Sequence, residues 1–265
     1  MGVACPLGKP KLAPHHTMLS TYQGKAKILY PTDHPQVLRV FFKDSATAFN
    51  GQKQATIEGK GRLNCLITTC IFQYLQSQGI ATHFLEALDD RSILVRALRI
   101  IPLEVVVRNI SAGSLCKRLG IPVGQPLPQP LVEFYYKNDA LGDPLVTDDH
   151  IYLLGLAVPD QLTKLRELAL EINRLLRGLF RGINLILVDF KLEFGLDADG
   201  NILLADEISP DSCRLWDDRA GSLEERIMDK DRFRQDLGQI AENYQEIADR
   251  LLSIGCKTKQ MGDTD

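Results

Sequence analysis

Short alternating apolar segments dominate the first part of the chain and give way to helical spacing further along. Residues 22–49 alternate β-branched or aromatic residues with polar ones, interrupted by Pro and Asp, which predicts antiparallel strands joined by short turns. Residues 62–78 place apolar side chains three and four positions apart and stop at Gly79, which predicts a helix. Further strands are expected at residues 81–88, 92–98 and 103–109.

The second part of the chain combines helical patterns with a hairpin. Residues 161–181 and 231–252 carry apolar side chains on one face and predict two long amphipathic helices. The DADGN sequence at residues 197–201 predicts a turn between two apolar strands. The proline-rich residues 121–130 favour a surface loop over a ligand for an SH3-type domain.

These elements predict an α+β fold with antiparallel strands, arranged in two lobes. A β-rich N-terminal lobe would span residues 18–102 and an α+β C-terminal lobe residues 103–265, with a candidate hinge at residues 100–102. Residues 1–17 contain three prolines and are expected to form a disordered tail. With 265 residues and 45% hydrophobic content, the chain can bury one large core or two modest ones.

Charge and cysteine content narrow the classes of function. The net charge of −3 and the isoelectric point near 6.0 give no global attraction to nucleic acid or membrane lipid, so a small anion bound by local basic groups is the expected partner. The six cysteines form no CxxC pair, and we interpret them as reduced and buried. No apolar run reaches the roughly 18 residues of a membrane span, and a cytoplasmic location is expected.

The candidate chemistry is concentrated in the acidic, strand-like residues 187–216. Apolar strands rarely carry carboxylates unless these are paired or bound to a cation, and oxygen ligands without nearby His or Cys favour magnesium. Because strand residues alternate faces, Asp189, Lys191 and Glu193 should share one surface. Glu193 and Asp206 are then the candidate metal ligands. A strand pair with one charged, solvated face explains the same spacing equally well.

Two small-residue segments could bind anions. Residues 24–27 (GKAK) fall at an expected hairpin turn, where Lys25 and Lys27 would suit a triphosphate, although a solvated lysine pair is the commoner explanation. Arg108 and Ser114 bound the sequence RNISAGS at the end of a predicted strand, where they could form a pocket for a second phosphate.

More charged residues follow the metal candidates. Asp211 and Arg214 lie in the turn sequence SPDSCRLW, directly after the acidic strands. Lys230 and Arg234 open the last predicted helix, where a solvated helix face is the alternative interpretation.

Taken together in chain order, a series of segments between residues 22 and 252 resembles the SAICAR synthetase family of purine biosynthesis: GKAKILY, KDSATAFNGQ, KGRLN, EVVVRNISAGS, KRLGI, YKNDALGDP, LILVDFKLEFG, DEISPDSCRLW and MDKDRFRQ. The combination of RNxxAGS, DFKxEFG and DExSPDxxRxW is highly specific. The resemblance implies a two-lobed fold distantly similar to protein kinases and ATP-grasp enzymes, with ATP in the cleft between an N-terminal ATP-binding lobe and a C-terminal substrate-binding lobe.

The resemblance also implies a reaction. ATP, 5-aminoimidazole-4-carboxylate ribonucleotide (CAIR) and L-aspartate would give SAICAR, ADP and phosphate through a carboxyl-phosphate intermediate. Position by position, the resemblance assigns the ATP phosphates to Gly24, Lys25, Ala26 and Lys27, and Mg²⁺ to Glu193 and Asp206. It assigns CAIR to Glu104, Arg108, Ser114, Asp211, Arg214, Lys230 and Arg234. The aspartate subsite and proton handling are assigned to Lys137, Asp143, Asp189 and Lys191.

Two other functions stay open at this point. The lobed fold and the DFK element also suit a kinase of polyols or inositol phosphates, although the chain lacks the HRDxxxxN loop of kinases that act on proteins. A regulatory module that binds nucleotide without turnover is the second, but such a module need not retain both Glu193 and Asp206. The sequence leaves a homodimer open.

Overall fold

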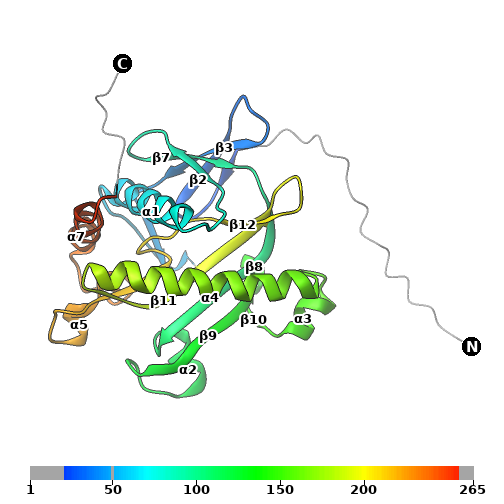
Figure 1. Ribbon diagram of the computed structural model, residues 1–265. Helices are drawn as coiled ribbons and strands as arrows, with labels where there is room; N and C mark the ends of the chain where they lie inside the picture. The colour runs from blue at the N-terminus through cyan, green and yellow to red at the C-terminus, as the bar shows by residue number, and fades with distance from the viewer. Residues whose placement is uncertain (1–20, 49–50, 257–265) are drawn as a thin grey trace, which may run out of the picture.

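A computed structural model describes residues 21–48 and 51–256 of the chain (Figure 1). The first of its two large sheets follows the order β1-β2-β3-β7-β6, with every neighbouring pair antiparallel. Its strands are β1 (Tyr22–Gln23), β2 (Lys27–Pro31), β3 (Val37–Phe42), β6 (Phe84–Ala87) and β7 (Ser92–Arg96). A separate hairpin pairs β4 (Ser45–Ala48) with β5 (Lys53–Thr56).

The second large sheet is also antiparallel and has β11 at its centre. The order is β10-β9-β8-β11-β12, and β13 pairs with the first half of β11. Its strands are β8 (Arg99–Ile110), β9 (Pro126–Tyr136), β10 (Leu145–Val146), β11 (Leu185–Leu196), β12 (Ile202–Ala205) and β13 (Cys213–Asp217). With antiparallel sheets and separate helices, the described residues confirm the α+β class predicted from the sequence.

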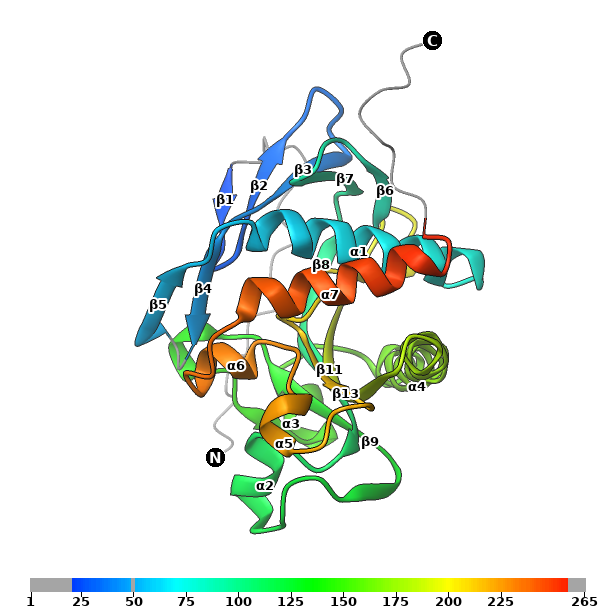
Figure 2. The ribbon, with the colours of Figure 1, turned by 90° about the vertical axis from the view of Figure 1, so that its left-hand side faces the viewer.

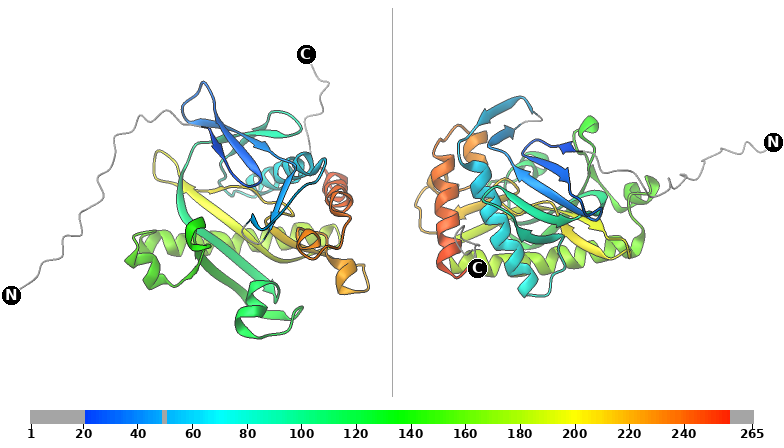
Figure 3. Two further views of the ribbon diagram at one scale, coloured as in Figure 1. Left: turned by 180° about the vertical axis from the view of Figure 1, so that it is seen from behind. Right: turned by 90° about the horizontal axis from the view of Figure 1, so that it is seen from above.

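Long helices cover these sheets. Helix α4 (Pro159–Gly182) runs across the second sheet, whereas α1 (Lys60–Ser77) packs on the first sheet and lies beside α7 (Ile240–Ser253) (Figures 2 and 3). Short helical turns complete the fold: α2 (Ser114–Leu119), η2 (Asp139–Leu141), α3 (Asp148–Leu153), α5 (Leu223–Arg226) and α6 (Asp231–Arg234). Within the described residues, no helix is long and apolar enough to cross a membrane.

Periodicity and close packing explain why these helices form where they do. Leu162, Leu165 and Leu176 of α4 are fully buried, as helical spacing along one apolar face predicts. Helix α1 begins two residues before the predicted range and ends before Gly79, whose φ of 86° suits glycine. At the other end, a Cβ on Gly61 would lie 2.4 Å from the carbonyl oxygen of Phe42. The start of α1 is therefore pressed directly against the end of β3.

Two predicted elements differ in the structure. The proline-rich stretch is not only a loop, because β9 begins at Pro126, which lies opposite Ile110 of β8. The short strand β10 pairs with the last residues of β9. Among the described residues no strand pairs with this edge of the first half of β9, and proline is tolerated there. The predicted helix at 231–252 is divided into α6 and α7, because Asp236 and Gln239 adopt positive φ angles of 57° and 53°.

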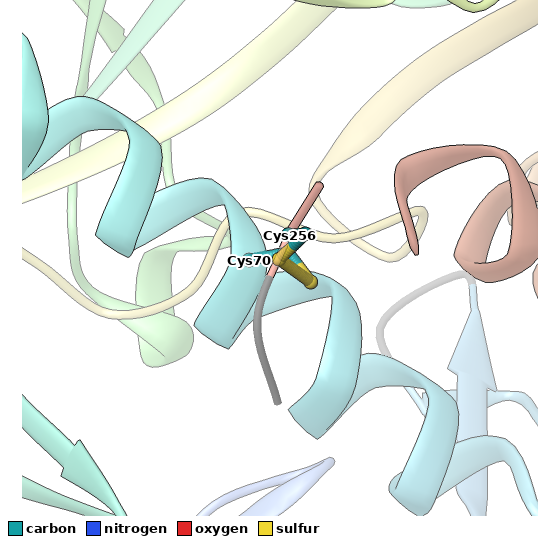
Figure 4. Close-up of a disulfide and its surroundings, with 2 residues drawn as sticks. All are labelled: Cys70 and Cys256. Carbon is teal, nitrogen blue, oxygen red and sulfur yellow. A yellow bond between two sulfur atoms is a disulfide. The ribbon is translucent and has the colours of Figure 1, made fainter. Parts of the chain in front are cut away.

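The cysteines also differ from the prediction that all are reduced. Cys70 of α1 and Cys256, which follows α7, form a disulfide with a Cα–Cα distance of 5.4 Å (Figure 4). Cys65, Cys116 and Cys213 are free and buried, as expected, and Cys5 lies outside the described residues together with the predicted 1–17 tail. No local sequence pattern signals this pairing, because its two cysteines are 186 positions apart and meet only through the packing of α1 and α7.

The disulfide should contribute measurably to stability. We expect Cys256→Ser to lower the free energy of unfolding by about 2–4 kcal/mol, because cross-linking two distant positions restricts the unfolded chain. Urea denaturation of oxidised protein measures this change. Dithiothreitol should destabilise the wild type to the same extent and leave the variant unaffected. If the wild type and Cys256→Ser were equally stable without dithiothreitol, the expectation would be contradicted.

Candidate active site

The centre of the site is the face of β11 that the DFKLEFG sequence presents. The predicted alternation is confirmed, since Phe190, Leu192 and Phe194 are at most 1% exposed within the hydrophobic core. Lys191 and Glu193 point to the opposite face, where their side chains form an ion pair. Glu193 lies opposite Ala205 of β12 in the sheet register. Asp206, the next residue, is thereby brought beside this row of charges.

Lys191 bridges the two candidate metal ligands, and two further lysines contact one ligand each. Lys191 Nζ contacts Glu193 and lies 3.3 Å from Asp206 Oδ2, and Lys137 Nζ lies 2.8 Å from Glu193 Oε1. Lys27 forms an ion pair with Asp206 and a second one with Glu207 at 2.9 Å. Burial alone would raise the pKa of Asp206, but Lys27 and Lys191 outweigh it and hold this pKa far below its usual range. The carboxylate therefore stays charged at neutral pH.

Arginines organise the neighbouring part of the same sheet. Arg108 on β8 is 3% exposed, and its guanidinium lies 2.7 Å from both Glu133 and Asp189. It also donates a hydrogen bond of 3.1 Å to the hydroxyl of Ser114, at the start of α2. Arg214 on β13 approaches Asp189 at 2.9 Å from the other side. Asp189 thus holds two arginines in place.

Arg108, Asp189 and Arg214 line one polar cavity of about 380 Å³. Ten of the residues selected from the sequence line it: Lys25, Glu104, Arg108, Ser114, Asp189, Lys191, Asp211, Arg214, Lys230 and Arg234. The wall is completed by Val106, Tyr135, Phe190, Ser212 and Cys213. A cavity with six cationic side chains in its wall suits a substrate that carries a phosphate and a carboxylate, because guanidinium groups match both anions.

The other selected residues lie beside the cavity. Lys27, Lys137, Glu193 and Asp206 form the lysine-bridged group described above, and Gly24 and Ala26 flank Lys25 in the turn between β1 and β2. Lys25 pairs at 2.7 Å with Asp139 of η2. Asp143 closes the η2 loop, where its Oδ1 accepts a hydrogen bond of 2.8 Å from the backbone N–H of Asn138.

Several charged or polar side chains of the site were not selected from the sequence: Lys60, Glu133, Tyr135 and Glu207. Glu133 and Tyr135 lie on β9, where the hydroxyl of Tyr135 donates to Glu133 Oε2 at 3.0 Å. A carboxylate within the apolar VEFYY strand is the same signal that marked the acidic hairpin, and it could have identified Glu133. Lys60 carries no such signal, because its neighbours in GKGRLN are polar or small.

Gly113 is required for the position of Arg214. It has a φ of 57°, and a Cβ there would lie 2.4 Å from one guanidinium nitrogen of Arg214. We expect Gly113→Ala to displace this guanidinium and to weaken binding of the phosphorylated substrate about tenfold, on the scale of one charged hydrogen bond. Calorimetric titration would measure the affinity. Gly120→Ala is a suitable control, because it also has a positive φ but open space around its Cβ. Equal losses in the two variants would point to backbone strain alone.

The carboxylates could contribute to a magnesium site but not complete one. Among the described residues, no group of three or more His, Cys, Asp and Glu side chains lies close enough to hold a metal ion. Glu193 and Asp206 supply two hard oxygen donors side by side. Magnesium is commonly bound by one or two carboxylates together with waters and substrate phosphates, so this donor set fits an ion that arrives with a nucleotide.

The fold and the site together define an α+β protein with a cation-rich cavity beside a lysine-bridged pair of carboxylates. A family model described as SAICAR synthetase matches residues 20–251. A phosphoribosylaminoimidazole-succinocarboxamide synthase from Acaryochloris marina is 56% identical over 232 residues, which are 88% of this chain and 95% of that protein. The protein of the same name from a Synechococcus species is 60% identical over 87% of this chain and 93% of its own length.

Solved structures agree with these relatives. The synthase of this name from Ehrlichia chaffeensis superposes with a TM-score of 0.85 at 44% identity, covering 90% of this chain and 99% of that one. A SAICAR synthetase in complex with ADP superposes with a TM-score of 0.84 at 47% identity, covering 88% and 98%. The chain therefore belongs to the SAICAR synthetase family, a family of ATP-dependent ligases of purine biosynthesis. Membership confirms the sequence-based resemblance and disfavours the kinase alternative.

Proposed function

We propose that this protein joins CAIR to L-aspartate with consumption of ATP, giving SAICAR, ADP and phosphate. The observation that carries the proposal is the arginine-lined cavity, which adjoins the lysine-bridged pair Glu193 and Asp206. One part of the site suits a phosphorylated carboxylic acid and the other a nucleotide triphosphate, and a family relative has been solved with ADP bound.

The reaction needs two steps, because a carboxylate could acylate an amine directly only by expelling oxide, which is a very poor leaving group. An oxygen of the CAIR carboxylate attacks the γ-phosphorus of ATP, and the bond to the bridging oxygen breaks to release ADP. The amine of aspartate then attacks the carbonyl carbon of the carboxyl phosphate, phosphate departs with its bonding electrons, and the amine loses a proton. Positioning and charge neutralisation are the main catalytic contributions in such transfers.

The nucleotide side of the site is assigned to residues from both sheets. Lys25 and Lys27, with the backbone of Gly24 and Ala26, bind the ATP phosphates. Burial alone would lower the pKa of Lys27, but Asp206 and Glu207 raise it, so its ammonium stays charged beside the phosphates. Glu193 and Asp206 would hold Mg²⁺, which would supply positive charge that offsets the negative charge of the nucleotide phosphates.

The CAIR side is assigned to the cavity. Arg108, Ser114, Arg214, Lys230 and Arg234 bind its phosphate and carboxylate, with Glu104 and Asp211 on its polar edge. Arg108 and Arg214 are suited to this role, because their carboxylate partners fix the guanidinium planes before substrate arrives.

The aspartate subsite and the proton transfers are assigned to four residues in the middle of β11 and around the η2 loop. These are Lys137, Asp143, Asp189 and Lys191. Lys191 lies between Glu104, Glu193 and Asp206, at the junction of the two parts of the site, where both substrates would meet.

The arrangement of the chain around this site extends the proposal. We assign the range 18–102 to an ATP-binding lobe and the range 103–265 to a substrate-binding lobe, and β8 runs without interruption through the boundary between them. We expect a cytoplasmic enzyme, and the homodimer stays a prediction.

A coupled assay tests the proposal directly. Purified protein is incubated with MgATP, CAIR and L-aspartate, and phosphate and SAICAR are quantified. We expect phosphate release that requires both co-substrates, equals SAICAR formation and stops on addition of EDTA. Release of phosphate or ADP that is indifferent to aspartate would refute the ligase and restore the kinase alternative. ATP binding without any turnover would favour the regulatory module.

A further inference from the structure

The start of α1 places a fully buried lysine behind the wall of the cavity. Lys60 is 0% exposed, and its Nζ lies 2.6 Å from Asp211 Oδ2 and 3.2 Å from the carbonyl oxygen of Ser45. Asp211 lines the cavity, whereas Lys60 does not. A buried ammonium is stable only when it is paired, so this contact fixes both side chains.

A second helix holds the same carboxylate. Tyr244 of α7 is 0% exposed, and its hydroxyl donates a hydrogen bond of 2.8 Å to Asp211 Oδ1. Each oxygen of Asp211 therefore has its own donor, one from α1 and one from α7. Burial alone would raise the pKa of Asp211, but Lys60 and Lys230 outweigh it and hold this pKa well below its usual range. The carboxylate is charged and fixed in orientation.

Backbone contacts leave Lys60 little freedom to move. The N–H of Gly61 donates to Asp44 Oδ1 at 2.8 Å, and Asp44 is itself held by Arg91 at 2.9 Å. Eight residues further along the same helix, the hydroxyl of Thr68 donates to the carbonyl oxygen of Ile208 at 3.3 Å. Helix α1 thus holds the segment that carries Asp211 at two separate points.

Asp211 in turn faces a lysine of the cavity. Lys230 Nζ lies 3.7 Å from Asp211 Oδ2, and both residues line the cavity with Arg234. The pKa of Lys230 lies below its usual value, chiefly because the side chain is buried and also because Lys60 and Arg234 are positively charged. The carboxylate of Asp211 acts in the opposite direction and raises this pKa. The position of Asp211 therefore influences both the placement and the charge of Lys230.

We propose that Lys60 and Tyr244 are positioning residues, which hold Asp211, and through it Lys230, in the arrangement that binds the anionic substrate. The kinetic part of this inference rests on the ligase reaction proposed above. Asp211 and Lys230 line the part of the cavity that is assigned to CAIR, so the effect of Lys60 and Tyr244 should appear in the binding of CAIR and not in the binding of ATP.

Tyr244→Phe and Lys60→Met test the proposal. The first removes a single hydroxyl, and the second replaces the ammonium by an apolar group of similar length. Arg62→Met is the matched control, because Arg62 also joins α1 to α7 through Gln245 at 3.2 Å but does so at the surface, away from Asp211. Steady-state kinetics with CAIR, ATP and aspartate varied in turn, together with thermal unfolding, are measured for all four proteins.

We expect KM for CAIR to rise about tenfold in Tyr244→Phe, on the scale of one lost hydrogen bond to a charged group. The rise should be larger in Lys60→Met. KM for ATP should stay within about twofold in both variants, and Arg62→Met should change neither constant by more than that. A purely structural role would lower the melting temperature and leave KM for CAIR unchanged, which would overturn the proposal, as would an equal effect of the control. If Lys60→Met does not fold, Tyr244→Phe decides alone.

A second measurement separates this inference from the proposed reaction. The ammonium signal of Lys230 can be followed by NMR of protein labelled with ¹³C,¹⁵N-lysine and assigned by its loss in Lys230→Arg. We expect the signal to shift in Tyr244→Phe and not in Arg62→Met, whether or not the wild type turns over CAIR. An unchanged Lys230 signal would refute the positioning role, whereas a wild type without ligase activity would refute only the proposed reaction.

Discussion

Replacement of Asp206 by asparagine is expected to reduce turnover by ~100-fold or more, the scale on which loss of one electrostatic contact impairs a charged transition state. The fold should survive the change. Asp206 has a φ of 60°, which asparagine tolerates better than other residues do. Lys27 keeps its ion pair with Glu207, and Lys191 keeps those with Glu193 and Glu104. The effect should therefore appear in kcat at saturating MgATP and not in thermal stability.

Asp199→Asn provides the control for this prediction. Asp199 lies in the exposed turn of the same hairpin, six residues before the end of the following strand, and the change removes the same charge. The variant should retain turnover within about twofold of the wild type, as for most surface substitutions. Near-normal turnover of Asp206→Asn would refute the assignment of this carboxylate to magnesium, and a comparable loss in Asp199→Asn would indicate a non-specific charge effect.

Arg108→Met should have the largest effect on stability. The guanidinium is 3% exposed and forms ion pairs with Glu133 and Asp189, so its removal leaves buried carboxylates short of a partner. We expect the free energy of unfolding to fall by about 3–5 kcal/mol, the scale for breaking a buried pair from one side. In the fraction that stays folded, the free energy of CAIR binding should become less favourable by about 1–3 kcal/mol, as for a lost charged hydrogen bond.

Urea denaturation and steady-state kinetics measure the two effects separately. Arg99→Met is the matched control, since Arg99 lies at the exposed start of the same strand. It should change the free energy of unfolding by less than about 0.5 kcal/mol. If Arg108→Met were as stable as this control, the buried ion pairs would not have the structural role described. An unchanged KM for CAIR would count against a role of Arg108 in binding.

Local patterns were sufficient for many of the elements. The alternation in DFKLEFG correctly predicted which side chains of β11 enter the core, because a strand buried on one face leaves little choice of register. The same reasoning failed at residues 235–239. Apolar spacing continues through this stretch, but Gly238 and two residues with positive φ interrupt the helix. The spacing of apolar residues shows which face of a helix is buried, but it does not show where the backbone leaves the helical conformation. Gly238 was the only residue in this stretch whose type predicted a break.

What the sequence determined by itself was the set of chemical groups: two carboxylates on a hairpin, paired lysines at a turn, and arginines at strand ends. Local spacing and motif order were enough for this. Only the tertiary structure decided how these groups meet. Lys27 reaches Asp206, 179 positions away, because the segment before β6 pairs with β12 through Thr82 and Leu204. Lys60 and Tyr244 converge on Asp211 only because α1 and α7 lie side by side. Such contacts depend on how distant elements pack, and no local pattern encodes them.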